Sequence, residues 1–272
     1  MAGKRTISKM AVGMMLAVFL MSCASGGGDV SEKGAKKGDI IAFGSYEQDG
    51  NTANGKEPIE WEVLAVEGDG ILVVSRYVLD CVPYHEEYEG VTWETCTLRK
   101  WMNNDFYNAA FSPEERGQIL ESHIENPDNA CYGTSGGNAT KDRVFCLSVD
   151  EIREHYRFNV WYEDNQWGLS EQLLTEPTAY ARDKNVWIYT PNEEDYQSLL
   201  NRYEDEKDRE AWESPYTRDV IGKEGCVWWL RSPGNRENNA CDVDYGGRAG
   251  WDDNALVDVG DVGVRPALRL SR

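Results

Sequence analysis

The C-terminal stretch "DYGGRAGWDDNALVDVGDVGVRPALRL", residues 244–270, joins two unlike patterns. Its end, from Val262, has the pattern of a buried strand, with Val264, Ala267 and Leu268 as core candidates. The part before it is loose and polar: between Asn235 and Val262, ten of the 28 residues are Asn or Asp and four are Gly. A polar tract directly before a core strand predicts surface loops on a rigid frame, where binding usually resides.

A few apolar and aromatic residues interrupt this tract. Val257 and Val259 alternate with Asp258, which predicts a strand with one face buried. Tyr245, Arg248 and Trp251 are of the types most enriched at binding hot spots. The alternative is a solvated, turn-rich loop that binds nothing.

Upstream, strand and helix patterns alternate with long irregular segments. We expect a strand at Ile40–Phe43 and a hairpin over 59–74, turning at Gly68-Asp69-Gly70. Leu98, Trp101, Met102 and Phe106 fall at helical spacing, and capping signals stand at Ser112, Ser148 and Thr190. "CVWWLRSPG" (226–234) is a further buried strand. These patterns predict an α+β fold of short antiparallel strands, several short helices and long loops, in one domain over 38–272 with an acidic insertion around 157–222.

The N-terminus predicts export. Lys4, Arg5 and Lys9 precede the short apolar run 10–20, and Leu20-Met21-Ser22-Cys23 resembles a bacterial lipobox. We expect that 1–22 is a lipoprotein signal peptide, that Cys23 carries a lipid, and that 23–37 is a flexible tether. The protein would then lie in the cell envelope, anchored at the outer membrane or cell surface.

Composition and motifs argue against several classes of function. A formal charge of −20 disfavours nucleic acid as a partner. The three histidines lack metal-ligand spacing, and neither a phosphate-binding glycine loop nor a Gly-x-Ser-x-Gly elbow is present. We therefore expect no catalytic residue and no cofactor, and the protein is not expected to be an enzyme.

The six cysteines beyond Cys23 leave two alternatives. In an oxidising compartment an even count permits three disulfides. The other reading is reduced, buried thiols, for which Cys146 in "VFCLS" has the right surroundings.

Trp251-Asp252-Asp253-Asn254 loosely resembles the Trp-Asn-Asp calcium and sugar motif of animal C-type lectins. The Glu-Pro-Asn motif that accompanies it in those lectins is absent, and the nearest stretch is Glu125-Asn126-Pro127. We therefore expect no metal here.

Longer motifs carry a wider resemblance. "PIEWEVL", "VLDCVPY", "TWETCTLRKWMNNDFYNAAFSPEE", "DRVFCLSVDE", "WWLRSPG" and "GVRPALRL" resemble an exported bacterial domain family of largely unknown function, over residues 38–270. That family is similar to the formylglycine-generating-enzyme branch of the C-type lectin fold. It includes variable lipoproteins of diversity-generating retroelements, in which an error-prone reverse transcriptase rewrites adenines in a C-terminal coding region. The active-site Cys pair of formylglycine-generating enzymes matches no position here.

The resemblance implies a fixed scaffold that presents a hypervariable, ligand-binding surface. Trp251, Leu256 and the valines would belong to the scaffold, although hot-spot chemistry places Trp251 among the contacts. The contact candidates are Asp242, Asp244, Tyr245, Arg248, Trp251, Asp252, Asp253, Asn254 and Asp258. Rewritten asparagine codons also give Ser, Thr, Phe, Ile or His, and the tract contains none of these.

Together these patterns predict a surface-anchored lipoprotein that binds a protein or glycan through its C-terminal tract. The alternatives are a structural envelope lipoprotein with no specific ligand and an enzyme of the formylglycine-generating type.

Overall fold

The computed structural model describes residues 34–158, 160–162, 167–200 and 220–272. The expected signal peptide, Cys23 and most of the tether lie outside the described residues, as does the acidic stretch 201–219. The structure contains 18% helix and 33% strand, mixed along the chain, which confirms the α+β class.

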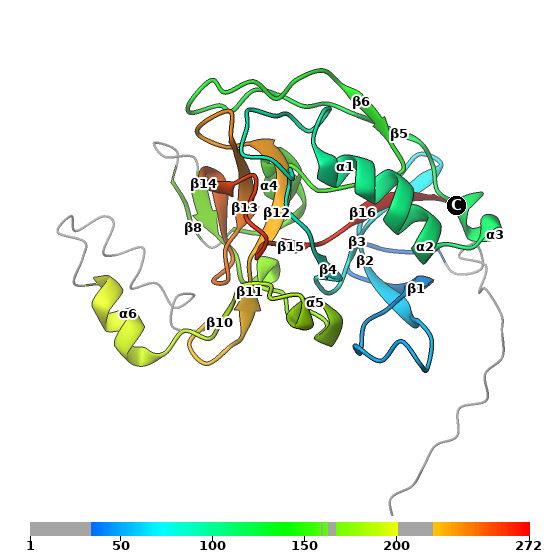
Figure 1. The fold of residues 1–272 in the computed structure, drawn as a ribbon, viewed down its shortest axis with the longest axis horizontal. Coiled ribbons are helices and arrows are strands. Elements are labelled where there is room, and N and C mark those ends of the chain that lie inside the picture. The colour runs from blue at the N-terminus through cyan, green and yellow to red at the C-terminus, as the bar shows by residue number, and fades with distance from the viewer. Residues whose placement is uncertain (1–33, 159, 163–166, 201–219) are drawn as a thin grey trace, which may run out of the picture.

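A five-stranded antiparallel sheet forms one side of the molecule (Figure 1). The predicted hairpin is confirmed: strands β2 and β3 are joined at Gly68, whose φ of 54° suits glycine. Ile59, Trp61 and Val63 of β2 are buried at alternate positions, so this sheet turns one face to the core. In sheet order its strands are β1 (Ile40–Tyr46), β2 (Glu57–Glu67), β3 (Gly70–Ser75), β16 (Ala267–Ser271) and β7 (Val144–Phe145).

A seven-stranded sheet forms the other side. The strand predicted in "CVWWLRSPG" is β12, an inner strand of this sheet whose six residues are all buried. β13 and β14, which carry the polar tract, pair antiparallel beside it. In order the strands are β4 (Asp80–Cys81), β15 (Gly263–Val264), β12 (Trp228–Pro233), β13 (Asn239–Val243), β14 (Arg248–Leu256), β9 (Trp167–Leu169) and β8 (Val160–Tyr162).

The expected last strand is two strands in different sheets. β15 pairs in the seven-stranded sheet and β16 in the five-stranded one, and the chain crosses between them at Arg265-Pro266 (Figure 1). Pro266 has no N–H to donate to a ladder, so the strand breaks there. The core candidates Val264, Ala267 and Leu268 are all buried, and one apolar cluster runs through both sheets.

Short helices cover the sheets. The predicted helical spacing is confirmed by one continuous helical segment, α1 (Thr97–Trp101), η2 (Met102–Phe106) and α2 (Tyr107–Ala110). Capping boxes start α3 (Pro113–Arg116) and α4 (Val149–His155), as expected from Ser112 and Ser148. At α6 (Glu193–Leu200) the cap is Asn192, not Thr190, because the Asn192 side chain accepts the N–H of Glu194.

Much of the expected insertion belongs to the core structure. β8 and β9 extend the seven-stranded sheet, and α5 (Ala179–Asp183) buries Ala181 completely. β10 (Ile188–Tyr189) and β11 (Gly225–Cys226) form a separate two-stranded pair, and the described residues that follow β10 include α6. The remaining elements are the pair β5 (Ser122–Ile124) and β6 (Thr140–Asp142), and the 3₁₀ turn η3 (Glu171–Leu173).

No cysteine of the described residues is joined in a disulfide. Five of the six thiols are buried and only Cys131 is exposed, which agrees with the alternative of reduced thiols. Within the described ranges, no helix has the length and apolar content needed to cross a membrane.

Candidate functional site

The β13–β14 hairpin divides the expected contact residues between its two ends. Asn239 lies opposite Leu256 at one end, and Val243 lies opposite Ala249 at the other. Because each residue of a strand advances the chain by about 3.3 Å, the two ends are separate surfaces. The expected contact residues therefore do not form one continuous patch.

Asp244, Tyr245 and Arg248 lie at the turn between the two strands. One Asp244 oxygen accepts the backbone N–H groups of Gly246 (2.7 Å) and Arg248 (2.8 Å), so this carboxylate shapes the turn. Burial raises the pKa of Asp244, although these two bonds oppose the rise.

An aromatic cluster borders the same turn. The Tyr245 ring is 4.8 Å from the Tyr189 ring and 6.0 Å from the Trp187 ring, measured between centroids. Trp187 is 51% exposed, so this end presents aromatic surface.

Two expected contact residues lie inside the molecule. Asp242 and Trp251 are buried, and Trp251 belongs to the hydrophobic core with 3% exposure. Neither side chain is placed to touch a surface ligand directly, and Trp251 lies in the core, where the resemblance puts a scaffold residue. Asp252 and Asp253 lie on β14, but their side chains are outside the described part.

The far end of β14 differs from expectation. The strand predicted at Val257–Val259 is wrong, because β14 already ends at Leu256. Val257 is still fully buried, and its N–H donates to Asn238. Leu256, expected in the scaffold, is 41% exposed because it occupies the outward position before Val257.

Asn254 and Asp258 also lie at this end. The side-chain oxygen of Asn254 accepts a hydrogen bond of 2.8 Å from the Asn239 amide, which ties the two strands together. Asp258 is exposed beyond the strand.

A hollow of about 650 Å³ opens beside this far end. Tyr88 and Tyr132 stand on its wall, 60% and 51% exposed. The rest of the wall is polar and contains both signs of charge. It comprises Glu89, Gly90, Gly133, Thr134, Ser135, Asn235, Arg236, Glu237 and Asn238, from three segments far apart in the sequence.

One buried side-chain amide joins the loop that carries Tyr132 to the end of β12, just before the third segment. Asn129 donates to the carbonyls of Pro233 (2.9 Å), Gly234 (3.2 Å) and Trp251 (2.9 Å). Its side-chain oxygen accepts the N–H groups of Cys131 (2.9 Å) and Tyr132 (3.1 Å). The loop that carries Tyr132 is thereby fixed to the end of β12 and to Trp251 within β14.

The segment that carries Tyr88 is fixed by its backbone. Val91 donates to the carbonyl of Glu237 (2.9 Å), and an added Cβ on Gly90 would come within 3.1 Å of the Glu237 side chain. This close approach favours glycine at position 90. The hollow is thus built on three anchored loops.

Sequence reasoning missed Tyr88 and Tyr132. Each stands in a loop among acidic residues, glycine or asparagine, where no periodic pattern requires a buried aromatic. An aromatic residue in such a loop was the available signal, but only the fold shows that the two loops meet.

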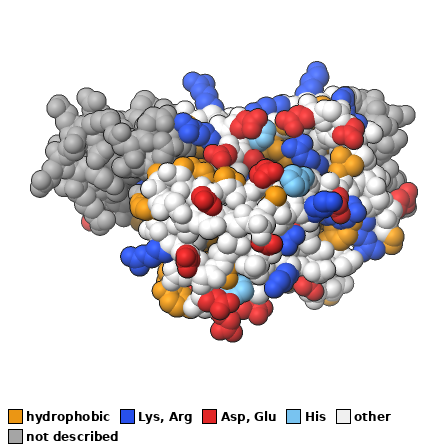
Figure 2. Space-filling model, turned by 90° about the horizontal axis from the view of Figure 1, so that it is seen from above, with side chains coloured by type: hydrophobic (Ala, Val, Ile, Leu, Met, Phe, Trp, Pro, Cys, Tyr) orange, Lys and Arg blue, Asp and Glu red, His pale blue; other side chains and the backbone are white. Residues whose placement is uncertain are grey.

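The acidic charge of the chain does not form a single-sign surface on the face shown in Figure 2. Acidic and basic side chains are interspersed there, with small apolar patches between them.

One arginine in each of the two C-terminal motifs is structural. Arg231 of "WWLRSPG" is buried, forms an ion pair with Glu151, and donates to the carbonyl of Cys146 (2.9 Å). Arg265 of "GVRPALRL" donates to the carbonyl of Ser75 (2.8 Å), and its guanidinium lies 4.9 Å from the centre of the Trp228 ring. These motifs therefore hold the two sheets together.

The buried thiols are poor nucleophiles. Burial raises the pKa of Cys81 and of Cys96 to about 12, and it raises the pKa of Cys146 and Cys226 further. Because the thiolate is the reactive form, these four side chains are inert at neutral pH.

Two comparisons, one with curated proteins and one with solved structures, found no match. Residues 68–272 match a family described as a domain of unknown function, DUF6273. This match includes the hollow, the β13–β14 hairpin and all but the first two strands of the five-stranded sheet. The chain therefore belongs to the DUF6273 family.

Proposed function

We propose that this protein is an envelope-tethered binding module that takes a protein or glycan ligand in the hollow between Tyr88, Tyr132 and Asn235–Asn238. One observation carries the proposal: the polar tract meets two half-exposed tyrosines at an open hollow, one of whose loops is held by a buried amide. Concave sites with aromatic walls and a few positioned polar groups are typical of ligand binding.

The chemistry of the wall favours a polar ligand. Tyrosine rings offer flat apolar faces and hydroxyl groups, so they suit a sugar ring or an aromatic side chain. Thr134, Ser135 and the asparagines add hydrogen-bonding groups, and the charged residues are one base, Arg236, and two acids, Glu89 and Glu237. This wall suits neither a ligand recognised mainly by its net charge nor a purely apolar ligand.

The proposal extends to the fold and to diversification. A C-type-lectin-like scaffold and retroelement-driven variation of the tract both rest on the resemblance of the quoted motifs. The burial pattern limits where variation is tolerable. Sequence variation would concentrate at the two ends of the β13–β14 hairpin and would not occur at the buried Cys241, Val243 and Trp251.

Binding to a glycan array and to a displayed peptide library tests the binding function. We expect the full chain to select ligands, and the Tyr88→Ala/Tyr132→Ala variant to lose at least tenfold in affinity with an unchanged melting temperature. The matched control is Trp187→Ala/Tyr245→Ala, which removes two rings at the other end of the hairpin and should bind as the parent does. The reverse pattern would place the site at the aromatic cluster. If neither probe binds, the structural-lipoprotein alternative gains.

Sequencing the DNA around the gene tests diversification. A nearby copy of codons 235–268 that differs only at adenines, beside a reverse transcriptase gene, would support it. A fixed binding protein would have no such copy.

Metabolic labelling with a radioactive fatty acid tests the anchor. We expect label on the parent chain and none on Cys23→Ser. Label that survives this substitution would refute lipidation at Cys23.

A further inference from the structure

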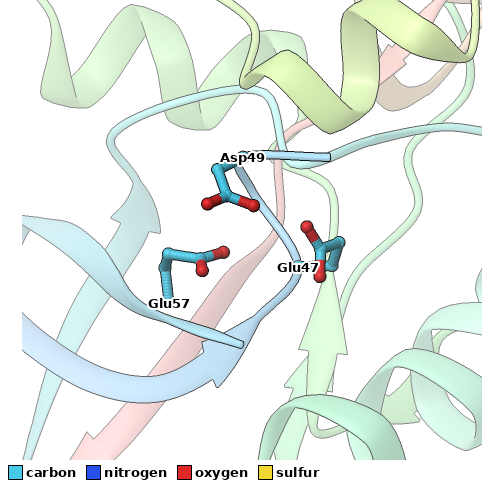
Figure 3. Close-up of side chains that lie close together, drawn as sticks. All are labelled: Glu47, Asp49 and Glu57. Atoms are coloured by element: carbon cyan, nitrogen blue, oxygen red, sulfur yellow. The ribbon is translucent and has the colours of Figure 1, made fainter. Parts of the chain in front are cut away.

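Three carboxylates converge in the loop between β1 and β2. Glu47, Asp49 and Glu57 each direct one oxygen into a common space, and these three oxygens lie within 4.8 Å of one another (Figure 3). Glu47 and Asp49 follow β1, and Glu57 is the first residue of β2, so all three belong to one loop and its edge. This loop is far in the sequence from the segments that line the hollow. Nothing in the proposed binding function uses them.

The Glu47 carboxylate points to a missing ligand. Glu47 is only 8% exposed, and its Oε1 is fully buried without a hydrogen-bond donor among the described residues. Leaving a buried charge without a partner is costly, so such groups normally pair with a cation or become protonated. Burial is the largest cause that raises the pKa of Glu47, the neighbouring Asp49 and Glu57 raise it further, and a hydrogen bond from the Gly50 backbone to the carboxylate opposes the rise.

The other two carboxylates are held in place by the loop. Asp49 accepts the N–H of Asn51 (2.8 Å) and the side-chain amide of Asn54 (2.7 Å), and these bonds lower its pKa. Glu57 accepts the backbone N–H of Gln48 (2.8 Å). These bonds hold both carboxylates in place beside Glu47.

No described basic side chain neutralises this cluster. None of the three acids forms an ion pair with a described residue. The nearby Lys184 instead forms an ion pair with Asp80, with 2.8 Å between Nζ and Oδ1. A fourth acid adds to the imbalance: Asp183 Oδ2 would lie 2.9 Å from a Cβ placed on Gly50. The backbone N–H of Tyr180 donates to the Gln48 carbonyl, so the loop is docked on α5.

We propose that Glu47, Asp49 and Glu57 form a calcium site that fastens the β1–β2 loop. The donors are all oxygen, which a hard cation prefers, and the space between them suits Ca²⁺–oxygen distances of about 2.3–2.6 Å. The loop is open to solvent at Asp49, so water can complete the coordination shell. Sites of this kind in extracellular modules bind calcium with Kd of about 0.1–1 mM.

Calorimetric titration of CaCl2 into the EDTA-treated full chain at pH 7.5 tests the site. We expect one Ca²⁺ per chain, and a rise of roughly 5 °C in melting temperature at about 10 mM CaCl2. The Glu47→Gln variant should lose at least tenfold in calcium affinity. In EDTA it should be at least as stable as the parent, because it removes a repelled buried charge, whereas a merely structural Glu47 would lose stability on this change.

Glu60→Gln is the matched control, since Glu60 lies on the same strand β2 but pairs with Arg76 (2.7 Å) outside the cluster. It should bind calcium as the parent does. The competing explanation is a proton on Glu47. In that case the protein would gain stability as the pH falls through the raised pKa of Glu47 and lose it as the pH rises. Its melting temperature would not change when CaCl2 is added. A folded parent chain that gives neither heat nor a melting shift with CaCl2 refutes the calcium site, whatever the outcome at the hollow.

Discussion

At the scale of single residues, Asn129 is the clearest case in which one side chain positions a surface loop. It makes five hydrogen bonds and is almost fully buried, whereas the buried Asn126 in the same segment makes one, to the Asn138 carbonyl (2.8 Å). Asn129→Ala would leave buried donors and acceptors unsatisfied, so we expect a loss of about 3 kcal/mol in unfolding free energy. Asn126→Ala should cost about 1 kcal/mol.

Urea denaturation measures both changes, and hydrogen exchange at the amides of Cys131 and Tyr132 reports the loop itself. Exchange there should accelerate in Asn129→Ala and not in Asn126→Ala. Equal costs for the two variants would contradict the role given to Asn129.

The thiols give a second prediction at this scale. Because burial raises the pKa of Cys81 and Cys96 to about 12, from a usual value of 9.0, their thiolate fraction falls about a thousandfold. In a Cys23→Ser chain at pH 8, iodoacetamide should modify Cys131 rapidly and the buried thiols only after denaturation. Mass spectrometry counts the modified sites.

Cys131→Ser is the control and should leave no rapidly modified cysteine. Without reductant, the denatured Cys23→Ser chain should show all six thiols. A lower count would mean that disulfides form in the native protein and that its buried cysteines are not all reduced.

At the scale of elements, α4 is joined to β12 through one carboxylate. Glu151 closes the capping box of α4 and also forms the ion pair with buried Arg231. Removing one partner of a buried pair leaves the other charge uncompensated, so we expect Glu151→Ala to cost about 4 kcal/mol in unfolding free energy.

Glu115→Ala is a closely matched control, because Glu115 closes the same capping box at α3 without a buried arginine. It should cost about 1 kcal/mol. Denaturant titration of both variants measures the difference, and a cost for Glu151→Ala no larger than for Glu115→Ala would show that Arg231 does not depend on this pair.

Elements with local signals were predictable from the sequence. The β2–β3 hairpin has a short turn and alternates from Ile59 to Val63, and the boxes at Ser112 and Ser148 need only four consecutive residues. β14 was missed because its Asp, Asn and Gly residues disfavour strands, and pairing with β13 and β9 overrides that preference.

At the scale of the whole molecule, the candidate site could not be derived from the sequence. The hollow joins segments around 88–90, 132–135 and 235–238, which meet only after β12, β13 and the 128–137 loop have packed. The sequence located the third segment by its composition. It could not show that Asp242 and Trp251 turn inward, because inward and outward positions on a strand depend on its register.

The two sheets depend on each other through β16 and the residues just before it. β16 lies between β3 and β7 and contains the last residues of the chain, while Arg265 just before it contacts both sheets. Deleting residues 267–272 would expose the β3 edge and open the shared core, so we expect both sheets to unfold together. Near-ultraviolet circular dichroism should lose the signal of Trp61 in one sheet and of Trp228 in the other.

Deleting only Ser271 and Arg272 is the control and should preserve the fold, since Ala267, Leu268 and Leu270 supply the buried side chains. If the longer deletion kept a cooperative transition and the tryptophan signal of the seven-stranded sheet, the sheets would be independent units, and the crossing at Arg265-Pro266 would be only a connection between them.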